Sequence, residues 1–84
     1  MNTVTTLKEL SVQVQDTWTN GVYHEIMYLD KLVCLTKLDK SILVTVFRLD
    51  GDSRKIVNIG QWLDNSVKPD TIAKYVRKMI VESD

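Results

Sequence analysis

The chain has 84 residues, of which 44% are hydrophobic and 26% charged, values that are ordinary for one globular domain and that argue against intrinsic disorder. Eleven basic and eleven acidic residues give a formal net charge of zero, whereas a domain that binds nucleic acid without sequence preference is usually strongly basic. The sequence shows neither a secretory leader nor an apolar run of membrane-spanning length. We therefore expect residues 1–84 to form a single cytoplasmic domain that has no contact with a membrane.

The composition favours a sheet over helices. The chain contains 25 valine, isoleucine and threonine residues but a single alanine, Ala73. Side chains that branch at Cβ fit the pleated surface of a sheet, whereas alanine is the best helix former.

The N-terminal third predicts a hairpin. Thr6 and Glu9 have the spacing of a capping box, which would begin a short helix. Apolar and polar residues alternate from position 10, which predicts a strand over residues 10–18. The Asn20-Gly21 pair that follows is typical of a tight hairpin turn, so we expect residues 10–18 to pair with residues 23–29. In this register Trp18 lies opposite Tyr23, Val14 opposite Met27 and Val12 opposite Leu29.

A second hairpin is predicted in the middle of the chain. After a turn at Asp30-Lys31, residues 32–38 and 42–49 read as strands, and residues 50–53 form the loop that leads to a further strand ending near Ile59. The expected pairs are Phe47 with Ile56, Val46 with Val57, and Val44 with Ile59. Both faces of this hairpin are apolar, so both need a cover. One helix can cover one face, and the second cover would be the N-terminal segment, a partner protein or a second copy of the chain.

The C-terminal segment predicts a helix over residues 69–82. Gly60 is expected to end the preceding strand, with a short turn or loop after it. Pro69 suits the first position of a helix, and Asp70 is favourable near its N-terminus. The apolar residues recur at the spacing of a helix that faces a core, namely Ile72, Ala73, Val76, Met79 and Ile80.

Together these elements predict an α+β fold, with an antiparallel sheet of four or five strands and the C-terminal helix packed on one face. The alternative is a mainly helical bundle. Residues 59–79 loosely match the last two helices of a helix-turn-helix, and Thr36 and Asp39 could begin a helix over residues 37–49. However, seven residues separate Leu63 from Thr71, more than the short turn of that motif allows.

The sequence contains no pattern typical of catalysis, and we expect no catalytic residue, no metal site and no cofactor. One histidine (His24) and one cysteine (Cys34) cannot supply the four ligands of a structural zinc site, and nothing else marks a nucleophilic site. Cys34 lies in an apolar run and is expected to be a buried, inert thiol. We expect His24 to be an exposed or edge-strand residue. The three glycines form no phosphate-binding loop.

Basic residues of the C-terminal half are the candidates for a binding surface. Lys74, Arg77 and Lys78 share one side of the expected helix, and Lys68 precedes it. These charges either keep the helix surface solvated and offset its dipole or form a docking surface. The other candidates are Arg54 and Lys55, which could extend the basic surface, and Trp62, which is either a binding anchor or a cap on the core.

We therefore expect a small, noncatalytic regulatory or inhibitory protein that docks on a larger protein, of the kind found among phage accessory proteins. A homodimer is a further expectation. The alternative function is a nucleic-acid-binding regulator that uses residues 59–79, which the neutral net charge disfavours.

Overall fold

The computed structural model describes residues 2–20, 23–63 and 66–82. They form one five-stranded sheet, whose strands lie side by side in chain order, and two helices. The elements are β1 (Asn2–Val4), α1 (Leu7–Asn20), β2 (Tyr23–Tyr28), β3 (Lys31–Lys37), β4 (Ser41–Asp50), β5 (Ser53–Leu63) and α2 (Pro69–Glu82). This arrangement confirms the predicted α+β class.

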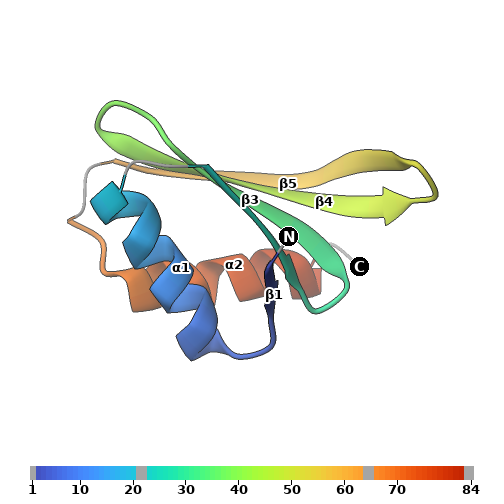
Figure 1. Cartoon of the computed structure of the whole chain (residues 1–84), viewed down its shortest axis with the longest axis horizontal. Coiled ribbons are helices and arrows are strands. Elements are labelled where there is room, and N and C mark those ends of the chain that lie inside the picture. Colours follow the sequence, from blue (N-terminus) through green and yellow to red (C-terminus); the bar gives the residue numbers. More distant parts are fainter. Residues whose placement is uncertain (1, 21–22, 64–65, 83–84) are drawn as a thin grey trace.

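Both helices lie on the same face of the sheet (Figure 1). α1 packs against β2 and β3, α2 packs against β4 and β5, and the two helices also contact each other. β1 pairs with β2 in parallel, with α1 as the crossover between them, and the other neighbouring strands are antiparallel. The predicted packing of the C-terminal helix on one face is confirmed. The N-terminal segment lies on that same face, so it does not cover the other one.

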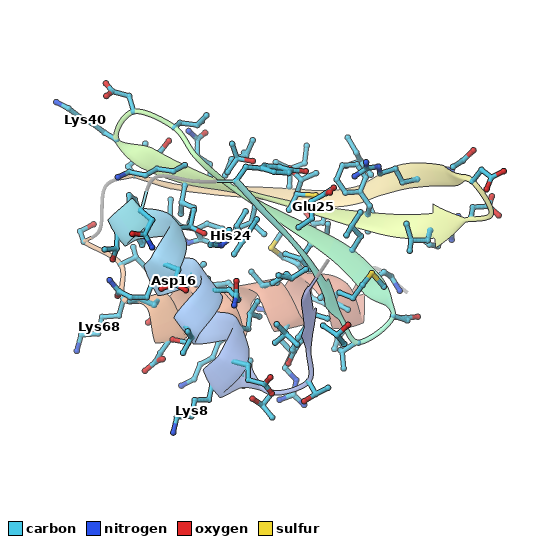
Figure 2. All side chains as sticks on the ribbon, viewed as in Figure 1. Lys8, Asp16, His24, Glu25, Lys40 and Lys68 are labelled. Atoms are coloured by element: carbon cyan, nitrogen blue, oxygen red, sulfur yellow. The ribbon has the colours of Figure 1, made fainter. Side chains whose placement is uncertain are left out.

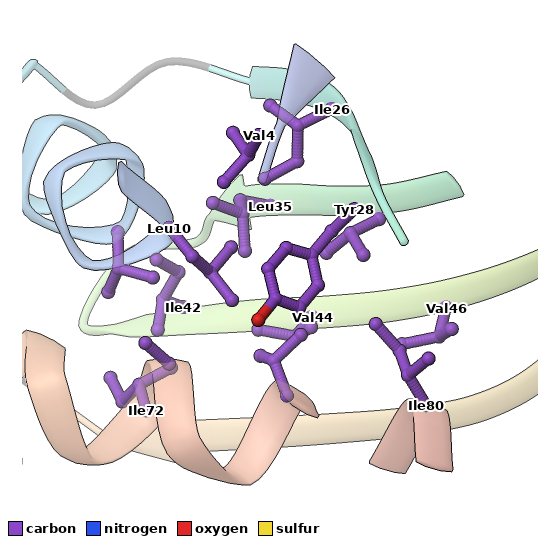
Figure 3. Close-up of a cluster of buried hydrophobic side chains, with 14 residues drawn as sticks. Val4, Leu10, Ile26, Tyr28, Leu35, Ile42, Val44, Val46, Ile72 and Ile80 are labelled. Atoms are coloured by element: carbon purple, nitrogen blue, oxygen red, sulfur yellow. The ribbon is translucent and has the colours of Figure 1, made fainter. Parts of the chain in front are cut away.

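The hydrophobic core fills the space between the sheet and the two helices (Figure 3). Every second residue of β2, β3 and β4 points into it, as the alternation of side chains along a strand requires. Among its most deeply buried members are Leu10 and Val14 of α1, Ile26 of β2, Val33 and Leu35 of β3, Ile42, Val44 and Val46 of β4, and Ile72, Val76 and Ile80 of α2.

The predicted hairpin of residues 10–18 with residues 23–29 is wrong, because residues 7–20 form α1. Leu10, Val14 and Trp18 are spaced by four residues, and this spacing fits a strand as well as a helix. Val12 distinguishes the two structures: a strand would bury it beside Val14, whereas in α1 its side chain is 51% exposed. Thr17, at the helical spacing from Leu10 and Val14, is buried instead.

The ends of α1 show which local patterns were informative. Thr6 is confirmed as the residue that caps the start of the helix, because the Glu9 amide donates a hydrogen bond to Thr6 Oγ1 at 3.1 Å. The Thr6 hydroxyl in turn donates a hydrogen bond to the Glu9 carboxylate at 3.0 Å. Asn20 is the last residue of the helix. An Asn-Gly pair is also typical of a helix C-terminus, which explains why it misled the hairpin prediction. Gly21 itself lies outside the described residues.

The β4–β5 hairpin is confirmed, with a change of register. Asp50 pairs with Ser53 across the turn, and Phe47 pairs with Ile56 as predicted. A bulge beyond this pair shifts the register by one residue. Consequently Val46 faces Asn58 rather than Val57, and Val44 faces Gly60 rather than Ile59.

The prediction that Gly60 ends the strand is wrong, since β5 continues to Leu63. A Cβ atom at Gly60 would lie 2.7 Å from the Trp62 ring and 3.4 Å from the Met79 side chain. The glycine therefore makes room for the Trp62 ring between the sheet and α2. It does not interrupt the strand.

The mainly helical alternative is also wrong. Residues 59–63, which would belong to the first helix of a helix-turn-helix, lie in β5, and residues 41–49 lie in β4. The prediction for α2 is confirmed at both ends, and Ile72, Ala73, Val76 and Ile80 are buried. Neither of the two helices in the described part of the chain is long and apolar enough to span a membrane.

The β2–β3 turn provides a test of backbone strain. It lies at Leu29-Asp30, one residue before the predicted position, and Leu29 has a φ of 58°. A leucine in this left-handed region is strained, whereas asparagine tolerates it. We expect Leu29→Asn to raise the free energy of unfolding by about 0.5–1 kcal/mol in urea denaturation. Leu38→Asn is the control, because Leu38 is also exposed but has no positive φ, and we expect it to give no increase in the free energy of unfolding. Equal effects of the two substitutions would contradict this explanation.

The close approach at Gly60 provides a second test. We expect Gly60→Ala to cost about 1–3 kcal/mol of stability, because the added Cβ meets the Trp62 ring. In a Trp62→Leu background the same change should cost clearly less, and a double-mutant cycle in urea measures the difference. An equal cost in both backgrounds would show that the ring is not what requires the glycine.

Candidate protein-docking surface

The sheet has a second face that no described element covers. We call this uncovered face of the sheet the open face. Its side chains alternate with those of the core along each strand. Its apolar members are Tyr23 and Met27 of β2, Leu32 and Cys34 of β3, Leu43, Phe47 and Leu49 of β4, and Ile56, Ile59 and Leu63 of β5; its charged members are Glu25 of β2 and Arg54 of β5.

The strand register aligns apolar side chains across the open face. Met27 pairs with Leu32, Leu32 with Phe47, and Phe47 with Ile56, so one apolar row crosses four strands. Side chains directly opposite one another on antiparallel strands lie close enough to pack. The row is buried at Leu32 and 53% exposed at Ile56. It therefore forms a continuous apolar surface that remains accessible at the β5 side.

Several large side chains of the open face are half exposed. The exposed fractions are 53% for Tyr23, 54% for Ile59 and 70% for Leu63. Single exposed apolar residues are common, but a contiguous group on one face of a small domain is typical of an interaction site.

A charged interaction spans the open face from β5 to β2. The Arg54 guanidinium donates a hydrogen bond to Glu25 Oε2 at 2.8 Å, and its Cζ lies 5.4 Å from the centroid of the Phe47 ring. Beside it, the Tyr23 hydroxyl donates a hydrogen bond to the Cys34 sulfur at 3.2 Å. The centre of the open face thus combines an ion pair with two aromatic rings. Figure 2 labels Glu25 on this face and His24, its neighbour, on the helix side.

These contacts shift the titration of the side chains involved. The hydrogen bond from Arg54 lowers the pKa of Glu25, so the carboxylate stays charged to lower pH. The hydrogen bond to Cys34 raises the pKa of Tyr23, and burial raises the pKa of the Cys34 thiol. Cys34 is buried, as predicted, and its raised pKa disfavours the reactive thiolate.

The basic residues of α2 lie on the opposite side of the molecule. Lys74, Arg77 and Lys78 are exposed on the helix surface that points away from the sheet, and we call these three residues the basic ridge. Lys68 is exposed at the helix entry, where its carbonyl accepts a hydrogen bond from the Thr71 amide at 3.0 Å.

The structure does not place the remaining candidates on the basic ridge. Arg54 belongs to the open face, and Lys55 pairs with Arg48 near the turn of the β4–β5 hairpin. Trp62 is half-buried on the helix side, packs against the core and has its ring centroid 6.2 Å from that of Tyr75. The seven candidates therefore divide between the two sides of the sheet and the hairpin end.

The helix side carries open depressions. One, with a volume of about 440 Å³, lies between the helices and is lined by Leu7, Lys8, Asp70 and Lys74. Another, of about 330 Å³, lies beside the basic ridge and includes Tyr75. Such depressions are too open to hold a small ligand away from water.

His24 lies in the part of β2 that extends beyond its pairing with β1, so the expected edge-strand position is confirmed, although the side chain is not fully exposed. It is half-buried on the helix side of β2, and its Nδ1 lies 3.1 Å from Thr17 Oγ1. The Thr17 hydroxyl donates to the Gln13 carbonyl at 2.9 Å, so it accepts its second hydrogen bond from the histidine. Within residues 2–20, 23–63 and 66–82, no three side chains of the metal-binding types are grouped to hold a metal ion.

Tyr23, Glu25 and Phe47 were not predicted to be members of a binding surface. For Phe47 there was a signal, because both faces of its hairpin are apolar. For Tyr23 and Glu25 there was none, since the hairpin prediction paired them with residues that belong to α1. Their neighbours across β2 and β3 become known only from the strand register.

Comparisons of the chain with protein-family models, with curated proteins and with solved structures gave no match.

The ion pair on the open face predicts a pH effect. A carboxyl group whose pKa is lowered by folding adds stability above its ordinary pKa, and this contribution is lost as the pH falls through the lowered value. We expect Arg54→Gln to raise the pKa of Glu25 toward its ordinary value and to remove this part of the acid dependence. Carboxyl-carbon NMR titration measures the shift. Lys55→Gln is the control, and an unchanged pKa of Glu25 in Arg54→Gln would contradict the assignment.

Proposed function

We propose that this protein is a noncatalytic binding protein, regulatory or inhibitory in effect, that docks on a larger folded protein through the open face. The observation that carries the proposal is a sheet covered by helices on one side only, with the apolar row from Met27 to Ile56 on the other side. Burial of such a surface provides the main driving force of protein association.

The size of the open face suits a protein partner. The described chain measures 35 by 22 by 21 Å, and the apolar row of the open face crosses four strands of its sheet. A small ligand would leave most of this area in water.

The composition of the open face supports the same proposal. Tyrosine and arginine are over-represented among the residues that dominate binding energy, and Tyr23 and Arg54 flank the centre of this face. The Arg54 side chain is 49% exposed, which leaves its guanidinium free to donate to a partner as well as to Glu25. The partner surface that fits is mainly apolar and carries a carboxylate or carbonyl group opposite Arg54.

The nucleic-acid alternative has weaker support. Its helix-turn-helix basis is lost because residues 59–63 form a strand, and the chain has no net charge. The basic ridge remains as its only structural support. Cations on the exposed side of a helix are also the ordinary means of keeping that surface solvated.

The experiment compares two arginine substitutions of equally exposed apolar residues. Ile56 lies on the open face and is 53% exposed, whereas Val12 lies on α1 and is 51% exposed. The wild-type protein is used to capture and identify a partner, whose affinity for each purified variant is then measured by calorimetry. We expect Ile56→Arg to weaken binding at least about tenfold, because it places a charge in an apolar interface, and Val12→Arg to leave binding unchanged.

The opposite pattern would overturn the proposal. Loss of binding in Val12→Arg alone would place the interface on the helix side. Binding to random duplex DNA that falls steeply with salt, and that is lost when Lys74, Arg77 and Lys78 are all changed to glutamate, would establish the nucleic-acid alternative.

A further inference from the structure

β5 has a free outer edge, which is a feature distinct from the open face. It is the last strand of the sheet, and no described strand pairs with its outer side. With 11 residues it is the longest strand of the described sheet. An exposed edge presents unpaired amide and carbonyl groups that can pair with a strand of another chain.

The two halves of this edge differ in how well they are protected against pairing with another strand. The first half carries Arg54, Lys55 and the bulge near Val57, and charges and bulges are the usual means of blocking edge pairing. The second half, residues 59–63 with the sequence IGQWL, has no charge, no proline and no bulge. Two of its side chains, Ile59 and Leu63, are among the most exposed apolar residues of the described chain.

The backbone groups that point outward can be assigned. The Ile59 amide donates to the Asn58 side chain at 2.9 Å, so it points away from β4. Residues of an antiparallel strand alternate between pairing with the neighbour and pointing outward. Gln61 and Leu63 therefore also direct their amides and carbonyls to the free edge, whereas Gly60 and Trp62 pair with β4.

We propose that a second copy of this chain pairs antiparallel with residues 59–63 of β5, around a two-fold axis at Gln61. In this register Gln61 faces Gln61 of the second copy, Ile59 faces Leu63, and Gly60 faces Trp62. The Ile59 amide exchanges its hydrogen bond to the Asn58 side chain for one to Leu63 of the second copy. The exposed apolar residues meet each other and no like charges are opposed. The lack of net charge on the chain also means that no long-range repulsion keeps two copies apart.

This arrangement continues the sheet from one copy into the next. A two-fold axis perpendicular to the sheet leaves both open faces on the same side, so the dimer presents the open face twice. Five residues of strand form a small contact, and small contacts give weak, concentration-dependent dimers.

The first test uses two substitutions at the axis. Gln61→Pro removes an outward amide that makes no bond to β4, whereas Gln61→Ala keeps that amide and removes only the side chain, which donates to Ser41 Oγ at 3.0 Å. Sedimentation equilibrium from about 10 µM to about 1 mM suits a contact of this size. We expect wild type and Gln61→Ala to dimerise alike and Gln61→Pro to associate at least about tenfold more weakly. Circular dichroism checks that both variants fold.

The second test measures the register and does not depend on a proline. In a Cys34→Ser background, Gln61→Cys places two sulfhydryl groups on facing residues whose Cα atoms are about 5.5 Å apart, within the range of a disulfide. We expect mild oxidation to cross-link this variant into a dimer and to leave Lys55→Cys, in the bulged half, as a monomer. A wild-type monomer throughout the concentration range, or equal cross-linking of the two variants, would overturn the proposal. Neither result depends on whether Ile56 contacts a partner.

Discussion

The packing of two 14-residue helices against one face of a five-stranded sheet is the interaction on which the rest of the structure depends. Leu10 and Val14 of α1 and Ile72 and Val76 of α2 have no exposed surface, and they meet the inward side chains of β2 to β4. Each fully buried aliphatic side chain contributes about 1.5–3 kcal/mol. The hydrophobic core of the described residues uses both helices. The described residues supply no further element for the second face.

The open face is stabilised in a different way. Its side chains cover one another within the apolar row, and the Arg54–Glu25 ion pair crosses above Phe47 and Cys34. Such an ion pair between partly exposed groups adds little stability in water. It does fix the direction of a guanidinium at the centre of an apolar surface, which is the composition expected where one protein recognises another. The free half of β5 lies beside this surface, so the two proposed associations use neighbouring but separate parts of the sheet.

How much could be predicted from the sequence differs from element to element, for physical reasons. The bounds of α2 were predicted correctly, because Pro69 and the spacing of the apolar residues that follow it fit a helix and do not fit a strand. α1 was not predicted, because apolar residues four positions apart fit the repeat of a strand as well as that of a helix. The Asn20-Gly21 pair likewise fits both a hairpin turn and the end of a helix. The β4–β5 register was correct at Phe47 and Ile56 and failed beyond the bulge, which no local pattern marked. Gly60 was wrongly predicted to end a strand, because the glycine is required by its contact with the Trp62 ring, which is known only from the structure.

For the candidate surface, Arg54 was singled out from the sequence, but its partner Glu25 lies 29 residues away along the chain and is known only from the fold.

The most direct test of this account is the solvent exposure of isoleucine methyl groups on the two faces of the sheet, measured by NMR as the relaxation caused by a soluble paramagnetic probe at low protein concentration. Ile56 and Ile59 are 53% and 54% exposed, whereas Ile42 is fully buried. We predict strong relaxation of the methyl groups of Ile56 and Ile59 and little effect on those of Ile42, Ile72 and Ile80. Protection of Ile56 and Ile59 equal to that of Ile42 in the monomer would contradict the account, because it would show that the second face of the sheet is covered.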